Sequence, residues 1–266
     1  MTLFCSDIDG TLLNPERTLS DRTVAAIRST LDAGHSFVLC SSRMPSSMRI
    51  LEGLYDGHDA PMIAYNGGLV LRSDGSASLN VPIGERDARA LYERCRDLNV
   101  HMSVYVGDDW YAWDDDFWSR RETNNTAVAP SLRSAHDYFG ETRLPGGSPH
   151  KVMCMGESNL IDQIASSVGG MAGLISYRSK DTYLEIANGN CSKGDAVKSV
   201  AGDLQVALSD VVFFGDNYND LPAFAVVGTS VAVANGRPEV LAAATHTTAR
   251  HHDDGVAQFL ESWIGS

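Results

Sequence analysis

The sequence predicts an α/β protein in which a parallel sheet carries helices on both faces and is interrupted by an inserted α+β segment. Two observations lead to this class. Short apolar runs alternate with segments of helical spacing from Met1 to Tyr65, and the same alternation returns after Lys193. Between them the pattern changes to a hairpin, an amphipathic helix and an aromatic-rich stretch. Such alternation is typical of parallel sheets whose strands are joined by covering helices.

The first part of the chain has three expected strands and two expected helices. The strands are the apolar runs 1–6, 36–40 and 62–65, and the helices are the segments 21–33 and 45–55. Ser20 is the expected N-cap of the first helix, and Gly34 ends it. Asn66-Gly67-Gly68 predicts a turn after the third strand. We therefore expect a β-α-β-α-β unit within one parallel sheet.

The middle and the end of the chain complete the expected organisation. In the middle we expect a hairpin at 69–81, helices at 85–98 and 160–168, and strands at 151–155 and 183–187. After Lys193 we expect helices at 194–203, 221–226 and 256–263, and strands at 211–214 and 230–233. The economical division is a core of residues 1–83 and 188–266 and an inserted α+β domain of residues 84–187.

Composition and charge exclude several kinds of protein. Of 266 residues, 43% are hydrophobic and 21% charged, which is typical of a globular protein and too apolar for a disordered one. Acids outnumber bases 34 to 21, giving a net charge of −13. We expect no nucleic-acid or membrane partner, because both kinds of binding need a basic surface. The expected partner is a small molecule, and the expected state is a monomer or small homo-oligomer.

The cysteines and the apolar segments indicate a cytoplasmic location. The five cysteines are scattered and form no CxxC pair, a pattern that favours reduced thiols over a disulfide framework or a zinc site. An acid at position 7 leaves no room for a signal peptide. The most apolar long segment, 221–234, is shorter than the roughly 18 apolar residues that a membrane span needs.

Acidic residues follow two of the expected buried strands. Asp7 and Asp9 follow the first strand, and Asp216 and Asp220 follow the strand 211–214. Ligands of parallel α/β sheets bind beyond the carboxyl ends of the strands. Two neighbouring carboxylates can act as nucleophile or metal ligand and as general acid or base, and Asp216 has the chemistry to bind Mg²⁺. An exposed acidic turn or a helix cap would explain either motif alone, but two acidic strand ends in one sheet favour a site.

Hydroxyl and cationic side chains stand at two further element boundaries. Ser41-Ser42-Arg43 lies between a strand and a helix, where a hydroxyl and backbone N–H groups form an anion site. The alternative is that a serine merely caps the helix. Lys193 lies in the first turn of a helix, where a lysine opposes the helix dipole unless an anion is nearby. The alternative there is an ordinary surface lysine.

The order of these motifs resembles that of the haloacid dehalogenase-like phosphohydrolases, and the details are similar to their Cof-type branch. The four motifs are DIDGTL from Asp7, Ser41-Ser42-Arg43, Ser192-Lys193-Gly194-Asp195 and GDNYND from Gly215. Further similar segments are 66–68, 183–186, 231–236 and 254–257. The resemblance runs through nearly the whole core and is weak in the insertion. It implies a Rossmann-like core with an inserted C2-type cap that covers the site as a lid.

The resemblance implies the catalytic residues. Asp7 is the nucleophile that becomes an aspartyl-phosphate, and Asp9 is the general acid and base. Lys193 binds phosphoryl oxygens and offsets the charge of Asp7. These roles agree with the chemistry, because a carboxylate that attacks a phosphate dianion needs a cluster of cations nearby.

The resemblance also implies a Mg²⁺ site and a phosphate site. The implied metal ligands are Asp7, Asp9 through its backbone carbonyl, Asp216 and, in a supporting position, Asp220. The implied substrate-binding residues are Ser41, Ser42, Arg43, Lys193 and Asn219. One difference stands out: many relatives have Thr-Gly-Arg where this chain has Ser41-Ser42-Arg43, so the hydroxyl is kept but Ser42 is bulkier than glycine.

The implied function is a Mg²⁺-dependent phosphatase acting on small phosphorylated metabolites, with sugar phosphates foremost. A phosphomutase would use the same aspartate, and the residues leave that alternative open. A phospho-aspartate signalling module is a third reading, against which stand the large insertion and Asp9. A set of aromatic residues in the insertion lines either a sugar-binding face or, as we favour, the core of the cap: Tyr105, Trp110, Tyr111, Trp113, Phe117 and Trp118.

Overall fold

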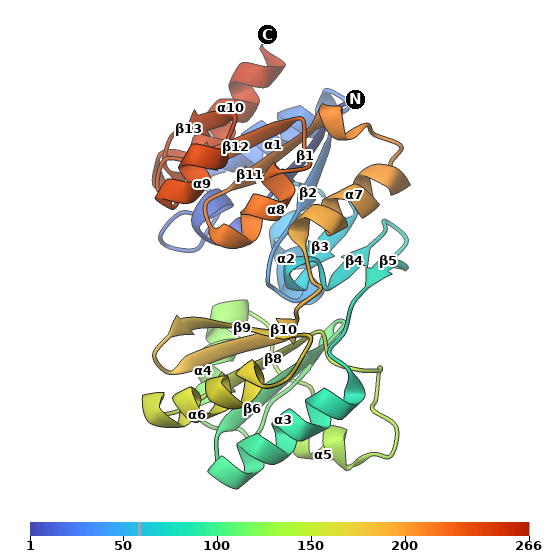
Figure 1. The fold of residues 1–266 in the computed structure, drawn as a ribbon. Coiled ribbons are helices and arrows are strands. Elements are labelled where there is room, and N and C mark those ends of the chain that lie inside the picture. Colours follow the sequence, from blue (N-terminus) through green and yellow to red (C-terminus); the bar gives the residue numbers. More distant parts are fainter. Residues whose placement is uncertain (58–59, 266) are drawn as a thin grey trace. The chain divides into compact units, whose positions relative to one another are not determined.

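The structure, a computed structural model, forms two compact units (Figure 1). It describes residues 1–57 and 60–265. Residues 58, 59 and 266, which fall in the ranges predicted for the core, lie outside the described residues. The first unit consists of Met1–Arg43, Met48–Asn80 and Ser192–Ser266, and the second of Met44–Ser47 and Val81–Cys191.

A five-stranded parallel sheet lies at the centre of the first unit. Its order is β13-β12-β11-β1-β2. The strands are β1 (Leu3–Ser6), β2 (Ser36–Leu39), β11 (Val211–Gly215), β12 (Thr229–Val233) and β13 (His246–Thr248). In the register, Leu3 of β1 lies opposite Ser36 of β2 and Val211 of β11. The predicted parallel sheet is confirmed.

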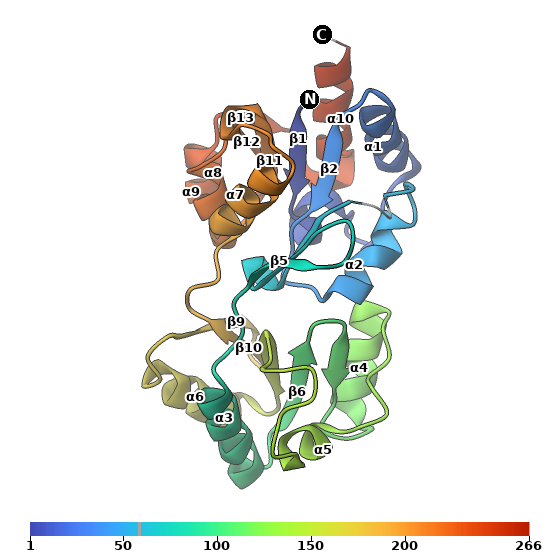
Figure 2. The same cartoon turned by 90° about the vertical axis from the view of Figure 1, so that its right-hand side faces the viewer.

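Helices cover both faces of this sheet (Figures 1 and 2). On one face lie α1 (Asp21–Asp32) and α10 (Gly255–Ile264), and on the other lie α7 (Lys193–Asp203), α8 (Leu221–Phe224) and α9 (Pro238–Ala243). Alternate residues of β1 serve the two faces: Phe4 contacts Trp263 of α10, whereas Leu3 and Cys5 pack with the residues of α7. Both faces of the strand are therefore apolar, as a sheet covered on both sides requires.

One predicted strand belongs to a different sheet. After α2 (Pro45–Glu52), β3 (Met62–Ala64) pairs antiparallel with β4 (Leu69–Leu71), which pairs with β5 (Ala77–Asn80). A single parallel bridge, Cys40 to Ile63, connects β3 to the end of β2. The prediction of a third strand within the parallel sheet is thus wrong. The turn at Tyr65–Gly67 sends the chain straight back, so that β4 takes the hydrogen bonds of β3.

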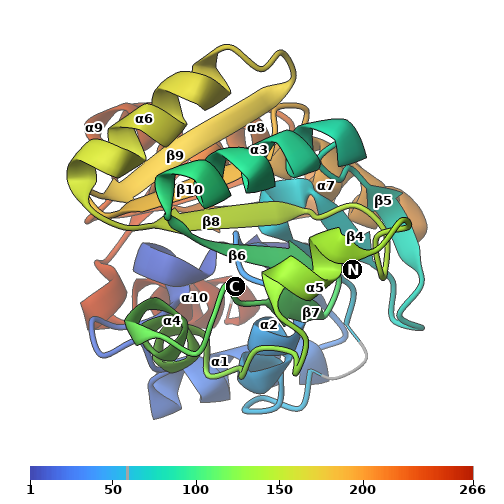
Figure 3. The ribbon, with the colours of Figure 1, turned by 90° about the horizontal axis from the view of Figure 1, so that it is seen from below.

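The second unit has an antiparallel sheet of order β7-β6-β8-β10-β9. Its strands are β6 (His101–Val106), β7 (Asp109–Tyr111), β8 (Lys151–Met155), β9 (Leu174–Lys180) and β10 (Tyr183–Asn188). Its helices are α3 (Glu85–Leu98), α4 (Phe117–Thr126), α5 (Ala135–Gly140) and α6 (Ser158–Gly169). Figure 3 shows α3 and α6 together on one face, and α4 on the other.

The aromatic residues of the insertion mostly lie inside the second unit. Buried side chains are Tyr105, Trp110, Tyr111 and Trp113, as the core interpretation predicts. Tyr105 stacks on Trp110, and its hydroxyl donates a 2.9 Å hydrogen bond to Glu122 of α4. Phe117 is an exception, since 64% of it is exposed.

Neither cross-links nor membrane-spanning helices are found in the described part of the chain. All five cysteines are free thiols, and four of them are buried. Among residues 1–57 and 60–265 no helix combines the length and the apolarity needed to cross a membrane.

A buried carboxyl group at the end of α2 makes the stability dependent on pH. Glu52 is 2% exposed, and burial raises its pKa to about 8. Between the unfolded pKa of 4.5 and about 8, the unfolded chain releases this proton while the folded chain keeps it, so stability falls as pH rises through that window. Glu52→Gln removes the effect. We expect the free energy of unfolding of this variant to exceed that of the parent by roughly 3–5 kcal/mol at pH 8. At pH 4 the two values should differ little.

Denaturant unfolding at several pH values measures this difference. The matched control is Glu16→Gln, which changes an exposed glutamate of the same unit. A stability difference between Glu52→Gln and the parent that stays constant from pH 4 to pH 8 would contradict the prediction.

Candidate active site

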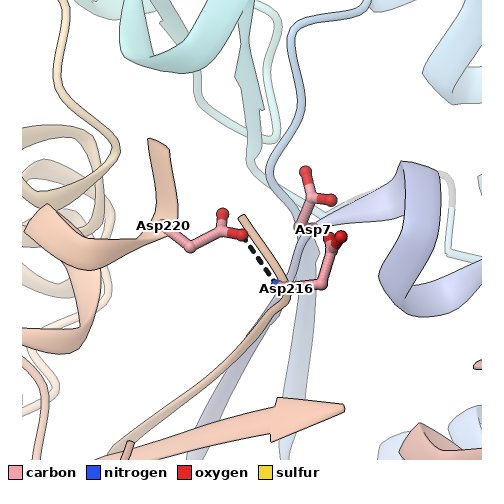
Figure 4. A group of neighbouring side chains, drawn as sticks. All are labelled: Asp7, Asp216 and Asp220. Atoms are coloured by element: carbon pink, nitrogen blue, oxygen red, sulfur yellow. Dashed lines mark hydrogen bonds between the residues drawn. The ribbon is translucent and has the colours of Figure 1, made fainter. Parts of the chain in front are cut away.

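The site lies where the strand order of the parallel sheet reverses. From β1 the chain proceeds to β2 on one side, and from β11 it proceeds to β12 and β13 on the other. Asp7 directly follows β1, and Asp216 directly follows β11. The backbone N–H of Asp7 donates a 2.9 Å hydrogen bond to the carbonyl oxygen of Phe214. The two acids are therefore neighbours at the sheet edge where α/β proteins bind ligands (Figure 4).

Lys193 is a buried cation between two carboxylates. It is the first residue of α7, and its side chain is 0% exposed. Its Nζ lies 2.6 Å from Oδ1 of Asp7 and 2.6 Å from Oδ1 of Asp220. Burial alone would lower the pKa of Lys193, but the Asp220 and Asp7 carboxylates outweigh it and raise that pKa well above its usual value. The lysine is therefore cationic at every physiological pH.

Asp220 is fully engaged by the protein itself. Its Oδ1 accepts from Lys193, and its Oδ2 accepts from the backbone N–H groups of Asp216, at 2.9 Å, and Asn217, at 3.0 Å. The first of these backbone bonds is dashed in Figure 4. Because the side chain is 0% exposed and both oxygens have donors, Asp220 fixes the loop after β11 and holds Lys193 in place.

Three carboxylates meet at the sheet edge against this one lysine. Oxygen atoms of Asp7, Asp216 and Asp220 all lie within 4.8 Å of one another. Burial and the neighbouring Asp220 raise the pKa of Asp216 to about 6, and the hydroxyl of Thr11 donates a 2.9 Å hydrogen bond to its Oδ1. Burial likewise raises the pKa of Asp7 well above its usual value, and the cluster offers only oxygen ligands. These residues fit a hard divalent cation such as Mg²⁺.

Gly10 permits the close approach of the two acidic loops. Its φ is +91°, and a Cβ atom at this position would lie 2.7 Å from Oδ2 of Asp216. Only glycine, which has no Cβ atom, adopts this backbone angle readily and fits the small space beside Asp216. The carbonyl oxygen of Gly10 accepts a 2.7 Å hydrogen bond from Nδ2 of Asn235, which anchors the turn to the loop after β12.

Asp9 is held by two arginines. Its Oδ2 accepts from Nε of Arg43 at 2.8 Å, and its Oδ1 accepts from Nη2 of Arg43 at 2.7 Å and from Nη2 of Arg17 at 3.3 Å. Burial alone would raise the pKa of Asp9, but the hydrogen bonds and charge of Arg43 outweigh it and hold that pKa below its usual range. Asp9 is thus a carboxylate in the free protein.

The predicted phosphate-binding residues lie on loops that contact one another. Ser41 is 1% exposed, and its carbonyl oxygen accepts a 2.8 Å hydrogen bond from the N–H of Asn66. Nδ2 of Asn219 donates to Oδ1 of Asn66 at 3.0 Å. At Gly67, with φ +93°, a Cβ would lie 2.4 Å from the carbonyl oxygen of Ser192, directly before Lys193. The half-buried Ser42 follows Ser41.

Three polar residues of the site had no role in the sequence-based prediction. Thr11 lies in the DIDGTL motif and Asn235 in the similar segment 231–236. Their positions in these segments could have indicated that they belong to the site. Arg17 lies in no motif, and nothing in its local sequence marks it. Its contact with Asp9 arises only from the folded turn.

Comparisons with known proteins show which family the chain resembles. A profile of the haloacid dehalogenase-like hydrolases matches residues 4–260. A Bacillus subtilis relative, "5-amino-6-(5-phospho-D-ribitylamino)uracil phosphatase YwtE", is 25% identical over 99% of this chain and 98% of its own. An Enterobacter relative named "HMP-PP phosphatase" is 26% identical over 97% of this chain and 94% of its own.

A solved structure shows the same fold. A haloacid dehalogenase-like hydrolase from Bacteroides thetaiotaomicron superposes with a TM-score of 0.90 over 98% of this chain and 99% of that one, at 22% identity. The fold and the profile together define a hydrolase. The chain belongs to the haloacid dehalogenase-like hydrolase family, which confirms the predicted membership.

Proposed function

We propose that this protein is a Mg²⁺-dependent phosphatase that hydrolyses small phosphate esters through an aspartyl-phosphate on Asp7. The observation that carries the proposal is the position of Asp7 at the switch point, 2.6 Å from a buried lysine and beside Asp216. A nucleophilic carboxylate needs positive charge nearby to approach a phosphate dianion, and Lys193 supplies part of it. The relatives named as phosphatases support the reaction class.

In the proposed reaction the residues act in two half-reactions. Asp9, a carboxylate in the free protein, takes up a proton from water as the substrate binds. An oxygen of Asp7 then attacks phosphorus, the bond from phosphorus to the ester oxygen breaks, and Asp9 gives its proton to the leaving alcohol. Water then attacks the phosphorus of the aspartyl-phosphate while Asp9 takes a proton from it. The bond from phosphorus to Asp7 breaks and inorganic phosphate leaves. Lys193 stabilises the phosphoryl oxygens throughout, with Ser41, Ser42 and Asn219 as further candidates.

The residues that would hold Mg²⁺ are Asp7, Asp216 and the backbone carbonyl of Asp9. Asp220 takes the supporting position that the resemblance gives it, because its oxygens already have donors. When bound, the ion would offset the charge of the carboxylates and of the phosphoryl group. Thr11 would orient Asp216 toward it through the 2.9 Å hydrogen bond.

The proposed substrates are phosphorylated small metabolites, with sugar phosphates first. The name of the Bacillus subtilis relative specifies a phosphorylated ribityl chain, which is a polyol phosphate. The second unit would serve as the cap that reads the leaving group, and its range Val81–Cys191 is close to the insertion expected from the sequence. A small metabolite agrees with the net charge of −13, which disfavours polyanionic macromolecules.

Phosphate release from a panel of esters tests the proposal. The panel holds sugar phosphates, nucleotides and one aryl phosphate, each assayed with Mg²⁺ and with EDTA. We expect release with Mg²⁺ and a decrease of ~10²-fold or more with EDTA, the scale of a lost Lewis acid. Equal release in both conditions would contradict the metal dependence.

Two other outcomes would assign a different activity. Conversion of a hexose 1-phosphate into the 6-phosphate without release of phosphate would identify a mutase. A long-lived phospho-Asp7 without turnover would identify a signalling module.

A further inference from the structure

Both oxygens of the Asp9 carboxylate are occupied by one arginine fork. Arg43 donates from Nε to Oδ2 at 2.8 Å and from Nη2 to Oδ1 at 2.7 Å. This parallel pair is the bidentate geometry in which arginine binds a carboxylate most specifically. Arg17 adds a single, longer contact at 3.3 Å.

The arginine side of the fork is largely buried, whereas the Asp9 side chain is 43% exposed. The Arg43 side chain is 12% exposed, whereas that of Arg17 is 51% exposed. The backbone of Arg43 is fixed on both sides: its N–H donates to Oγ of Ser41 at 3.3 Å, and its carbonyl oxygen accepts from Tyr65 at 3.2 Å. The arginine is therefore held by the same turn that positions the predicted phosphate-binding loop.

These contacts change the role that the resemblance implies for Arg43. Nε and Nη2 of Arg43 form the edge of the guanidinium that could donate two parallel hydrogen bonds to a phosphoryl group, and both already donate to Asp9. We propose that Arg43 is a positioning residue, which fixes the Asp9 carboxylate for proton transfer, and that it is not a ligand of the phosphoryl group. Arg17 is a weaker second support. The inference rests on the proposed acid–base role of Asp9.

A fixed carboxylate matters in both half-reactions. The same group must give a proton to the leaving oxygen and later take one from water, and a misplacement of about 1 Å in such a group costs ~10²-fold in rate. Loss of the fork therefore lowers kcat while leaving the affinity for phosphate unchanged. A ligand of the phosphoryl group would behave in the opposite way, because its loss weakens phosphate binding directly.

The experiment is a double-mutant cycle on Asp9 and Arg43 in the full chain. We expect Arg43→Gln to lower kcat by ~10²-fold, with KM and the inhibition constant of inorganic phosphate nearly unchanged. Asp9→Asn alone should cost ~10²–10⁴-fold. In the Asp9→Asn background, Arg43→Gln should have almost no further effect, because the carboxylate that it positions is gone.

Companion variants keep the test clear of folding effects. Arg43→Lys keeps a cation but loses the fork, so we expect a kcat between those of the parent and Arg43→Gln. Arg17→Gln should cost about fivefold or less, as for an exposed ion pair. The matched control is Arg28→Gln, which removes an exposed ion pair with Asp56 elsewhere in the first unit and should leave kcat unchanged.

The outcomes separate the inference from the proposed function. If Arg43→Gln weakens phosphate inhibition tenfold or more and its effect multiplies with that of Asp9→Asn, Arg43 binds the phosphoryl group and the inference is overturned. If Asp9→Asn keeps full activity, the acid–base role of Asp9 fails first, and the inference falls with it.

Discussion

Asp7→Asn should abolish turnover while leaving the fold intact. The amide has nearly the shape of the carboxylate, but its oxygen is a poor nucleophile and forms no acyl phosphate. Lys193 would keep its 2.6 Å contact with Asp220, so no charge is stranded. We expect phosphate release to fall by about 10³-fold or more, the scale on which enzymes lose activity when a covalent nucleophile is removed. Trapping of a radiolabelled phosphoryl group on the parent, and its absence from the variant, is the second readout.

The matched control for this variant is Asp195→Asn. Asp195 is an exposed aspartate in the first turn of α7, two residues after Lys193. Within the described residues its carboxylate forms an ion pair with Lys198. Its change should leave turnover as it is. Retention of more than a few per cent of activity by a folded Asp7→Asn would show that Asp7 is not the nucleophile.

Lys193→Met should reduce both stability and activity. The lysine is 0% exposed and lies 2.6 Å from each of two buried carboxylates, Asp7 and Asp220. Methionine has a similar length but no charge, so both carboxylates would remain buried without their cation. Breaking a buried ion pair in this way costs about 3–5 kcal/mol. Denaturant unfolding at pH 7 measures the loss, and phosphate release is expected to fall to background.

A second substitution separates the electrostatic cause from lost packing. In the Lys193→Met background, Asp220→Asn removes one of the stranded charges, and its amide oxygen keeps an acceptor for the backbone N–H of Asp216. We expect the double variant to regain a large part of the stability but none of the activity. If Lys193→Met is as stable as the parent, or if Asp220→Asn destabilises it further, the lysine does not neutralise these acids.

Most of the core fold was predictable because its signals are local. The runs that became β1, β2 and β11 are apolar, short and bounded by turn residues or acids, so each could be recognised alone. Elements without such a signal were missed. β13 is the three-residue segment His246–Thr248 and has no buried residue, while α9 has only six residues. In the second unit β6, β7, β9, α4 and α5 were not predicted either. β3 was recognised as a strand but placed in the wrong sheet, because the pairing of a strand depends on where the following turn sends the chain.

The acids and the lysine of the site were predictable because they stand at strand ends and helix starts. Their contacts were not. The Thr11 hydroxyl reaches Asp216 across 205 residues of sequence, and the Arg43 fork reaches Asp9 across 34. Such contacts depend on the register of β1 against its two neighbours and on side-chain rotamers. The family resemblance implies that Arg43 is a phosphate ligand, and only the folded turn shows that its guanidinium binds a carboxylate.

The strand order also has a consequence for biosynthesis. β1 is the first strand to leave the ribosome, but one of its two neighbours, β11, begins at Val211. One edge of β1 therefore remains without its neighbouring strand until most of the chain has been synthesised. The second unit is nearly contiguous, from Val81 to Cys191, and closes its own sheet in the meantime. The residues of the inserted unit are thus made before the parallel sheet can be completed, and the acidic cluster cannot form until Asp220 has been made.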